Sequence, residues 1–345
     1  MNAHPFSIVL LDLPTVTEDQ LVALHELQNI VNAERFPADP AVPYETRRRR
    51  WRRSGTCWAA LAAADGLPIA NAWIGVPQTE AEQHLIEFDL LVVPAHRQRS
   101  IGRHLLAVIA NVAAAEHRDL LLTQTNRHVP AGALFMRRIG AQPSLASRTL
   151  QLDLASFDQV VLDRWTTHAQ ERASGFELGF WAGAYPEADV LQMAKLHEVH
   201  NDSPHRSSTI GNTTITPELL RQREHEMDTY GQTRWTMYVR EQITGEIVGF
   251  SEVSWHQHNP EQVEQGVTGV LPAYRKRGLG HWVKAALLSK LARDLPEARF
   301  VRTGNPLSNT AMLGVNYDLG FKSISEDLWW ELRLEQVRYY LESRA

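Results

Sequence analysis

The order of apolar and polar positions predicts a strand, a turn and a helix in the second half of the chain. Residues 266–271 form a short apolar run that favours a buried strand, and Pro272 ends it because proline has no N–H for a sheet. Residues 282–292 carry apolar side chains at helical spacing. A basic turn with two glycines, residues 275–280, lies between them.

The same pattern occurs in the first half of the chain. Residues 86–93 favour a strand, a proline follows, and a long helix is expected over residues 101–117. Matching residues are separated by 178 to 180 positions: Pro94 and Pro272, Arg97 and Arg275, Asn126 and Asn305, Gly140 and Gly320. This spacing indicates an internal duplication on the scale of a domain. We expect a first copy at residues 1–155, a linker at 156–175 and a second copy at 176–345.

The remaining periodic segments also mix strands and helices. Strands are expected at residues 6–13, 57–64, 69–76, 120–124, 176–181, 235–240, 247–255 and 323–333, and helices at 17–34, 132–140, 188–197, 216–230 and 334–341. The short hairpins predict antiparallel pairing, so the fold class is α/β in the broad sense that includes α+β.

Composition limits the classes of function. The chain has 345 residues, 43% hydrophobic residues and a net charge of −5, which fits about two ordinary domains without a general affinity for nucleic acid. Cys57 is the only cysteine, which excludes an internal disulfide and a cysteine-based metal site and fits a reducing compartment. Neither a signal peptide nor an apolar run of about 18 residues is present, so we expect a soluble cytoplasmic protein that does not bind membranes.

The basic turn has the chemistry of a phosphate site. Gly278 and Gly280 remove side chains where a ligand could approach, and the free N–H groups of a helix start favour an anion. Arg275, Lys276 and Arg277 add positive charge. The turn is neither a Walker loop nor a dinucleotide fingerprint, because GxxxxGK[ST] and GxGxxG are both missing.

This stretch resembles the acyl-CoA-binding motif of the GNAT superfamily of N-acyltransferases, Gln/Arg-x-x-Gly-x-Gly/Ala after a strand that ends in Val-x-Pro. The later residues Thr303-Gly304-Asn305, Asn309, Met312, Asn316 and Leu319-Gly320-Phe321 resemble the family's next strand and helix. The resemblance implies two tandem GNAT folds, each a mixed and mostly antiparallel sheet flanked by helices, in an architecture similar to that of mycothiol synthases. It implies acetyl-CoA as cosubstrate, no metal, and cofactor contacts from Val270, Leu271, Arg275, Lys276, Arg277, Gly278, Leu279, Gly280, Asn305 and Asn309.

The resemblance also implies catalytic residues. Glu264 matches the place of a glutamate base in several GNAT enzymes, and period-two alternation would put Glu264, Gly266 and Thr268 on one face. The Thr268 N–H would then face the acyl oxygen. Glu252, in the preceding strand, is the rival base and a candidate for substrate binding.

The position of the family's acid tyrosine, seven residues after Asn309, holds Asn316. Tyr317 follows, about 100° further around the helix, so we expect it to point away. Asn316 could instead orient water or the pantetheine arm of the cofactor.

The first copy departs from the motif. Ile86 stands in place of Glu264, Ser100 in place of Gly278, and Val129 and Met136 in place of two polar helix positions. Glu87 and Asp89 lie nearby, but alternation points both to the other face. We therefore expect a degenerate first copy with a structural role. Retained CoA binding stays open, because Arg97, Arg99 and Gly102 are kept.

Two classes of function remain. The first is an acetyl-CoA-dependent N-acetyltransferase that moves an acetyl group directly to the primary amine of a small molecule or peptide, with Asp202 as a candidate acceptor-binding carboxylate. The second is a non-catalytic acyl-CoA-binding protein. The pattern does not indicate an oligomeric state.

Overall fold

The computed structural model describes residues 6–51, 57–156, 174–199 and 214–343, together with residues 160, 165, 167, 210 and 212. The chain divides into two compact units, and neither is a continuous segment. Unit 1 comprises Met1–Ser147, His205–Gly211 and Ser325–Ala345, and unit 2 comprises Arg148–Pro204 and Asn212–Ile324. Asp202 and most of the expected linker lie outside the described residues.

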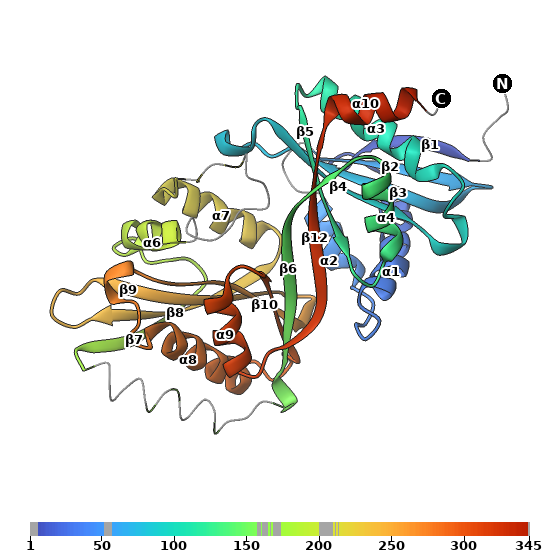
Figure 1. The fold of residues 1–345 in the computed structure, drawn as a ribbon. Coiled ribbons are helices and arrows are strands. Elements are labelled where there is room, and N and C mark those ends of the chain that lie inside the picture. The colour runs from blue at the N-terminus through green and yellow to red at the C-terminus, as the bar shows by residue number, and fades with distance from the viewer. Residues whose placement is uncertain are drawn as a thin grey trace. The chain divides into compact units, whose positions relative to one another are not determined.

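Unit 1 is a mixed sheet with helices on both faces. Its strands are β1 (Ser7–Asp12), β2 (Cys57–Ala64), β3 (Leu67–Gly75), β4 (Leu85–Val92), β5 (Leu120–Asn126) and the end of β12 (Lys322–Arg333), adjacent in that order. Its helices are α1 (Glu18–Arg35), α2 (Tyr44–Trp51), α3 (Ile101–Ala115), α4 (Pro130–Arg138) and α10 (Leu334–Glu342), with 3₁₀ turns η1 (Glu80–Glu82) and η2 (Pro94–His96). One face packs on α3, α4 and α10, and the other on α1 and α2 (Figure 1).

Unit 2 repeats this plan. Its strands are β7 (Phe176–Ala182), β8 (Gln232–Glu241), β9 (Ile247–His256), β10 (Asn259–Val270), β11 (Phe300–Pro306) and the end of β6 (Gln142–Asp153), adjacent in that order. Its helices are α6 (Val190–His197), α7 (Pro217–Thr229), α8 (Leu279–Asp294) and α9 (Thr310–Asp318), with 3₁₀ turns η3 (Leu154–Ser156) and η5 (Pro272–Tyr274). Helix α8 covers one face, and α6 and α7 cover the other (Figure 1). The packed side chains on both faces are apolar.

Each unit contains a parallel pair of strands at its centre. β4 and β5 are parallel in unit 1, and β10 and β11 are parallel in unit 2. The pairs β1–β2, β2–β3, β3–β4 and β5–β12 in unit 1, and β7–β8, β8–β9 and β9–β10 in unit 2, are antiparallel. The expected fold class, two GNAT-like folds with mostly antiparallel mixed sheets, is confirmed.

The last strand of each unit comes from the other half of the sequence. In unit 1, β12 pairs with β5 from Asp327 opposite Asn126 to Arg333 opposite Leu120. Trp330 and Leu332 of β12 are buried in the core of unit 1. In unit 2, Leu150 and Leu152 of β6 belong to the core with α8. The compact units therefore exchange strands, and the copy boundaries at 155 and 176 stay a prediction about the sequence repeat.

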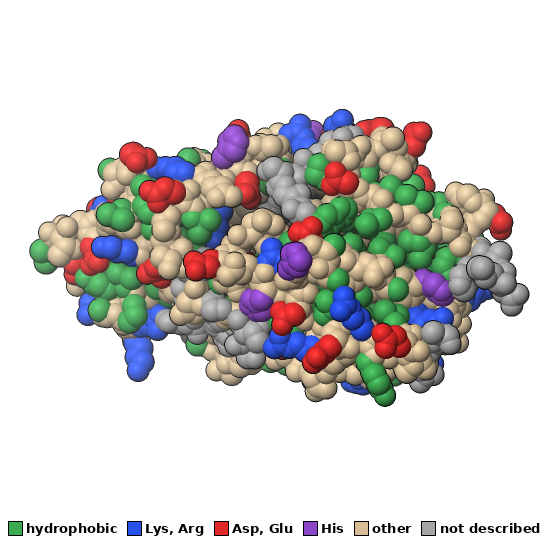
Figure 2. Space-filling view, turned by 90° about the horizontal axis from the view of Figure 1, so that it is seen from above, with side chains coloured by type: hydrophobic (Ala, Val, Ile, Leu, Met, Phe, Trp, Pro, Cys, Tyr) green, Lys and Arg blue, Asp and Glu red, His purple; other side chains and the backbone are tan. Residues whose placement is uncertain are grey.

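On the face that Figure 2 shows, acidic and basic side chains are interspersed, and neither sign of charge dominates. Among the described residues, no helix is both long and apolar enough to cross a membrane. The same residues contain no cluster of three or more histidine, cysteine or acidic side chains placed to hold a metal ion.

The exchanged strand should contribute strongly to the stability of unit 1. Trp330 is buried, and its indole N–H donates to the Thr125 hydroxyl at 2.8 Å. We expect Trp330→Ala to lower the free energy of unfolding by about 3–5 kcal/mol, measured by urea denaturation. Tyr339→Ala, at a side chain that is 75% exposed on α10, should change it by less than about 0.5 kcal/mol. Equal effects of the two substitutions would contradict this role of β12.

Candidate functional site

The basic turn of unit 2 has two residues in the left-handed backbone region. Lys276 has φ 64° and Gly278, which precedes the first residue of α8, has φ 80°. A Cβ on Gly280 would touch only Val270, at an ordinary 3.6 Å. The fold itself therefore has room for a side chain at Gly280, so the open space above the first turn of α8 suits a group from outside the chain.

The first copy keeps the same turn. Gln98 has φ 62° and Ser100 has φ 63°, matching Lys276 and Gly278. In both copies the arginine of the motif ties the turn to the preceding strand: Arg97 Nε donates to the Val92 carbonyl at 3.0 Å, and Arg275 Nε donates to the Val270 carbonyl at 3.1 Å. Serine at position 100 therefore keeps the backbone conformation of the turn. A residue other than glycine in the left-handed region destabilises the fold by about 1–2 kcal/mol.

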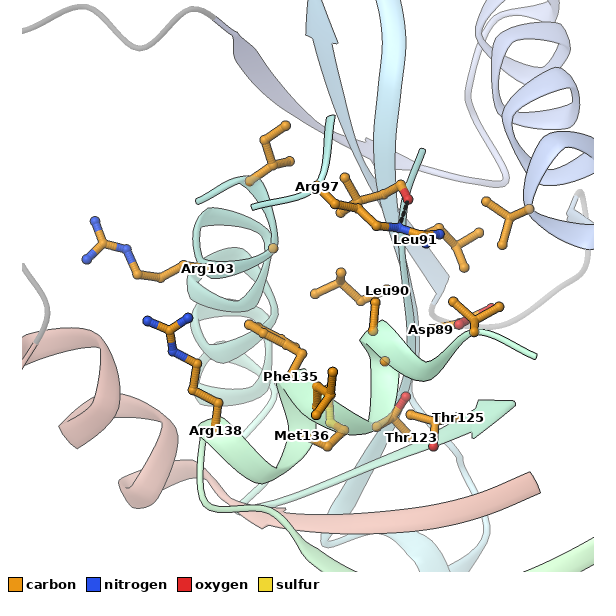
Figure 3. Close-up of a pocket in the computed structure, with 18 of the residues that line it drawn as sticks. Asp89, Leu90, Leu91, Arg97, Arg103, Thr123, Thr125, Phe135, Met136 and Arg138 are labelled. Atoms are coloured by element: carbon orange, nitrogen blue, oxygen red, sulfur yellow. Dashed lines mark hydrogen bonds between the residues drawn. The ribbon is translucent and has the colours of Figure 1, made fainter. Parts of the chain in front are cut away.

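A cavity of about 710 Å³ lies in unit 1 beside this turn (Figure 3). β4, β5, the turn and α4 line it, and Arg103 and Arg138 bring positive charge to it. Its single lining carboxylate is Asp89, which receives two hydrogen bonds from Arg35, at 2.7 and 2.9 Å. The cavity therefore carries basic side chains, but its lining residues include no unpaired carboxylate to take a proton.

The two parallel strands of unit 2 pair over only a short stretch, which leaves an opening between them. β10 and β11 pair only from Gln262 opposite Phe300 to Glu264 opposite Arg302. Beyond these residues the two strands diverge, so their facing backbone groups no longer bond each other. Glu264 therefore stands at the start of this opening, with Gln262 Nε2 donating to its carboxylate at 3.0 Å.

The expected common face of Glu264, Gly266 and Thr268 is wrong. On β9, Gln265 lies opposite Val253 and Thr268 opposite Ser251, so β10 holds one extra residue, a β-bulge, between the two pairs. Gln265 and Thr268 consequently share a face, and both bond the Ser251 hydroxyl, at 3.1 and 2.8 Å. The bulge reverses the alternation, so Glu264 and Thr268 lie on opposite faces of the sheet.

Glu252 lies in a buried polar network instead of at an open site. It accepts hydrogen bonds from the hydroxyls of Tyr185 and Thr236, the latter at 2.8 Å. Its carboxylate also lies 3.7 Å from Arg234 and 3.8 Å from His197. Burial and the neighbouring Glu252 carboxylate raise the pKa of Tyr185 well above its usual value. Glu252 is thus a paired anion that joins α6 to the sheet.

The three asparagines singled out in the sequence lie on α9 and on β11, which precedes it. Asn309 caps the helix, because its side-chain oxygen accepts from Met312 N at 3.2 Å. Asn316 is fully buried, and its Nδ2 donates to Asn305 Oδ1 at 2.7 Å. Tyr317 points away, as its helical position predicts, and its hydroxyl accepts from Arg148 at 2.8 Å.

The sequence reasoning missed Lys284. Its ammonium donates to Asn316 Oδ1, and its side chain is 1% exposed. Desolvation lowers the pKa of Lys284 from its ordinary value to about 7. A signal was available, because Lys284 has helical spacing with the buried Leu287, Leu288 and Leu291 and so interrupts the apolar face of α8.

The comparisons with known proteins agree with this geometry. Residues 24–141 match the family model "Acetyltransferase (GNAT) family", and this match lies in the copy with the cavity. No curated protein matches the chain.

Among solved structures, a tandem GNAT protein from the clavulanic acid biosynthesis pathway superposes with a TM-score of 0.78 at 23% identity, over 95% of this chain and 98% of that one. A GCN5-related N-acetyltransferase from Sphaerobacter thermophilus gives a TM-score of 0.68 at 15% identity, over 95% and 96% of the two chains. At these identities the likeness concerns the fold.

The buried lysine should give unit 2 a characteristic pH dependence. Because the pKa of Lys284 is lower in the folded chain than in the unfolded chain, the unfolded chain binds more protons between pH 7 and pH 10.5. This group therefore makes the free energy of unfolding increase with pH in that window, by at most about 1.4 kcal/mol per unit.

The first copy provides the control, since Leu106 and Met136 occupy the places of Lys284 and Asn316. Urea denaturation between pH 7 and pH 10 should show the increase in the wild type. It should be absent from the Lys284→Leu/Asn316→Met double variant. An identical pH dependence in both proteins would show that Lys284 titrates normally.

Proposed function

We propose that this chain is an acetyl-CoA-dependent N-acetyltransferase of the GNAT superfamily, because residues 24–141 match the family model and both units have a GNAT-like fold. It transfers the acetyl group directly to the primary amine of a small molecule or peptide. The observation that carries the proposal is the opening between β10 and β11, with the turn that starts α8 placed after the same strand.

The residues of unit 2 fit the cofactor. The turn at Arg275, Lys276, Arg277 and Gly278 supplies cations and the free N–H groups of a helix start for phosphates. Gly280 leaves the approach to that helix start open. Val270 and Leu271 end the strand beside the opening and would contact the pantetheine arm. Bound there, acetyl-CoA would supply the activated acyl group.

Glu264 is the proposed base. It is solvent-exposed at the start of the opening, where an incoming amine could deliver a proton directly or through water. Glu252 is on the same face, because Glu264 lies opposite Ser254 on β9, two residues from Glu252. The buried hydrogen bonds of Glu252 favour a structural role for it, and they leave Glu264 as the better candidate for proton removal.

The first copy has a different proposed role. The cavity, its cations and the preserved turn favour acyl-CoA binding there as well. The paired state of Asp89 and the absence of a counterpart to Glu264 favour binding without transfer. We therefore propose that the first copy has lost catalysis but still binds acyl-CoA. The alternative of a wholly non-catalytic acyl-CoA-binding protein requires that the second copy also lacks transfer activity.

A rate measurement tests the base. Glu264→Gln should lower the acetyl-transfer rate by roughly 10²- to 10⁴-fold, measured as thiol release with a panel of amines. Acetyl-CoA affinity should be nearly unchanged, and the fall in rate at acidic pH should disappear because glutamine does not titrate. Glu252→Gln is the control and should lower the stability of unit 2. A nearly normal rate in Glu264→Gln beside an inactive but folded Glu252→Gln would assign the base to Glu252.

Calorimetry tests the two binding sites. Gly280→Glu and Gly102→Glu each place a negative side chain at the helix start where the phosphates would bind. We expect each substitution to abolish one CoA site, so that the stoichiometry falls by half in either variant. If Gly102→Glu has no effect on CoA binding, the first copy holds no cofactor. If Gly280→Glu has no effect, the cofactor site of the second copy is misplaced.

A further inference from the structure

The buried Lys284 has no ionic partner among the described residues. Its ammonium contacts the Asn316 side-chain oxygen and lies 5.0 Å from the centre of the Phe321 ring. A buried cation normally has a carboxylate partner, because desolvation penalises an unpaired charge. The first copy has the apolar pair Leu106 and Met136 in the same places, both buried, so this fold does not require a lysine here.

In its protonated form, Lys284 fixes the direction of a chain of hydrogen bonds. A protonated amine only donates, so Asn316 Oδ1 must accept from Lys284 and Asn316 Nδ2 must donate onward. The next acceptor is Asn305 Oδ1, at 2.7 Å. This leaves the Nδ2 of Asn305 as the donor at the end of the chain. Bonds that run in one direction from a cation polarise one another, so this last donor is strengthened.

The chain of hydrogen bonds ends at the opening between β10 and β11. Asn305 lies on β11 beyond Arg302, the last residue that pairs with β10. Strand alternation from the buried Val301 places Asn305 on the α8 side of the sheet.

Gln265 lies across the opening on the same side, because it is opposite Val253, another residue of the α8 core. Gln265 is 7% exposed, and its Oε1 accepts no hydrogen bond from the described residues. Its Nε2 donates to the Glu252 carbonyl at 2.6 Å and to the Ser251 hydroxyl at 3.1 Å, so this amide is held against β9 and the donor at the opening itself is Asn305.

We propose that Lys284 is a positioning residue for acyl transfer in the second copy: through Asn316 it orients and polarises the Asn305 amide, whose Nδ2 stabilises the negative charge that develops on the thioester. This inference rests on the proposed function. In direct transfer the amine nitrogen bonds to the acyl carbon, and the carbon–sulfur bond breaks with its electron pair on sulfur. The proton of the amine goes to Glu264 or water, and CoA leaves as the thiolate.

The lowered pKa of Lys284 supports this role. Desolvation alone brings it to about 7, so the lysine is only partly protonated at neutral pH. Negative charge that arrives at the far end of the amide chain favours the protonated form. Lys284 is therefore most fully protonated in the charged transition state. Stabilisation of that state raises the rate of the reaction.

The double variant Lys284→Leu/Asn316→Met copies the pair of the first copy and should fold. We expect its kcat for acetyl transfer to fall by roughly 10- to 10³-fold, as for removal of one donor to a developing anion, while the KM for acetyl-CoA changes little. Lys290→Leu removes another lysine of α8, one that lies over the Phe180 and Trp235 rings, and should leave kcat unchanged. A normal kcat in the folded double variant would show that Lys284 and Asn316 only fill the core and do not affect the reaction.

A second measurement needs neither an acceptor amine nor transfer activity. The ionisation of bound CoA is followed by the ultraviolet absorbance of its thiolate, in Gly102→Glu protein so that the second copy gives the signal. We expect a thiol pKa below the usual value of about 8.5, and a return to it with Asn316→Asp, which has no donor for Asn305.

An unshifted thiol in the otherwise intact second copy would overturn the proposal. If CoA binds with a shifted thiol but no amine is acetylated, the chain of hydrogen bonds stands and the proposed transferase function fails. If CoA does not bind the second copy at all, both fail.

Discussion

The short parallel pair in each unit determines where its strands separate. β4 and β5 pair only from Leu85 opposite Leu120 to Glu87 opposite Leu122, and β10 and β11 pair over a similarly short stretch. After that the strands separate, and backbone groups that would bond each other in a continuous sheet need other partners. Because the helix that follows the first strand of each pair begins with a left-handed turn, its free N–H groups lie in the same part of the unit. The opening and the helix start together make an extended polar ligand the natural occupant.

A comparison of the two copies separates the features of the backbone that both share from the polar side chains that differ. Shape survives in both copies: the left-handed turn persists even where serine replaces glycine, and the arginine of the motif bonds the same strand carbonyl. The chemical groups differ. Glu264, Lys284 and Asn316 occur in the second copy, where the first has Ile86, Leu106 and Met136. The shared backbone with different polar groups is the basis for the different roles proposed for the two copies.

The sequence predicted the local elements well, because each has a short-range cause. Pro272, the two glycines and the helical period of α8 specify the strand, turn and helix without help from distant residues. It could not predict the bulge in β10, since an extra residue leaves no mark in an alternating pattern and depends on the pairing with β9. The exchange of β6 and β12 was equally hidden, because matched repeats supply interchangeable strands. The contact between Lys284 and Asn316 could not be predicted either, because it depends on how α9 packs against α8.

The exchange of strands also has a consequence for how the protein is made. Asn126 on β5 bonds Asp327 on β12, which lies 201 residues later in the chain. At a synthesis rate of about 5–20 residues per second, a ribosome needs on the order of 10–40 s to reach β12 after making β5. During that interval the nascent unit 1 has an unpaired strand edge and lacks Trp330 from its core. Unit 1 therefore cannot finish folding before β12 has been translated, unlike an N-terminal domain that folds as soon as it has been made.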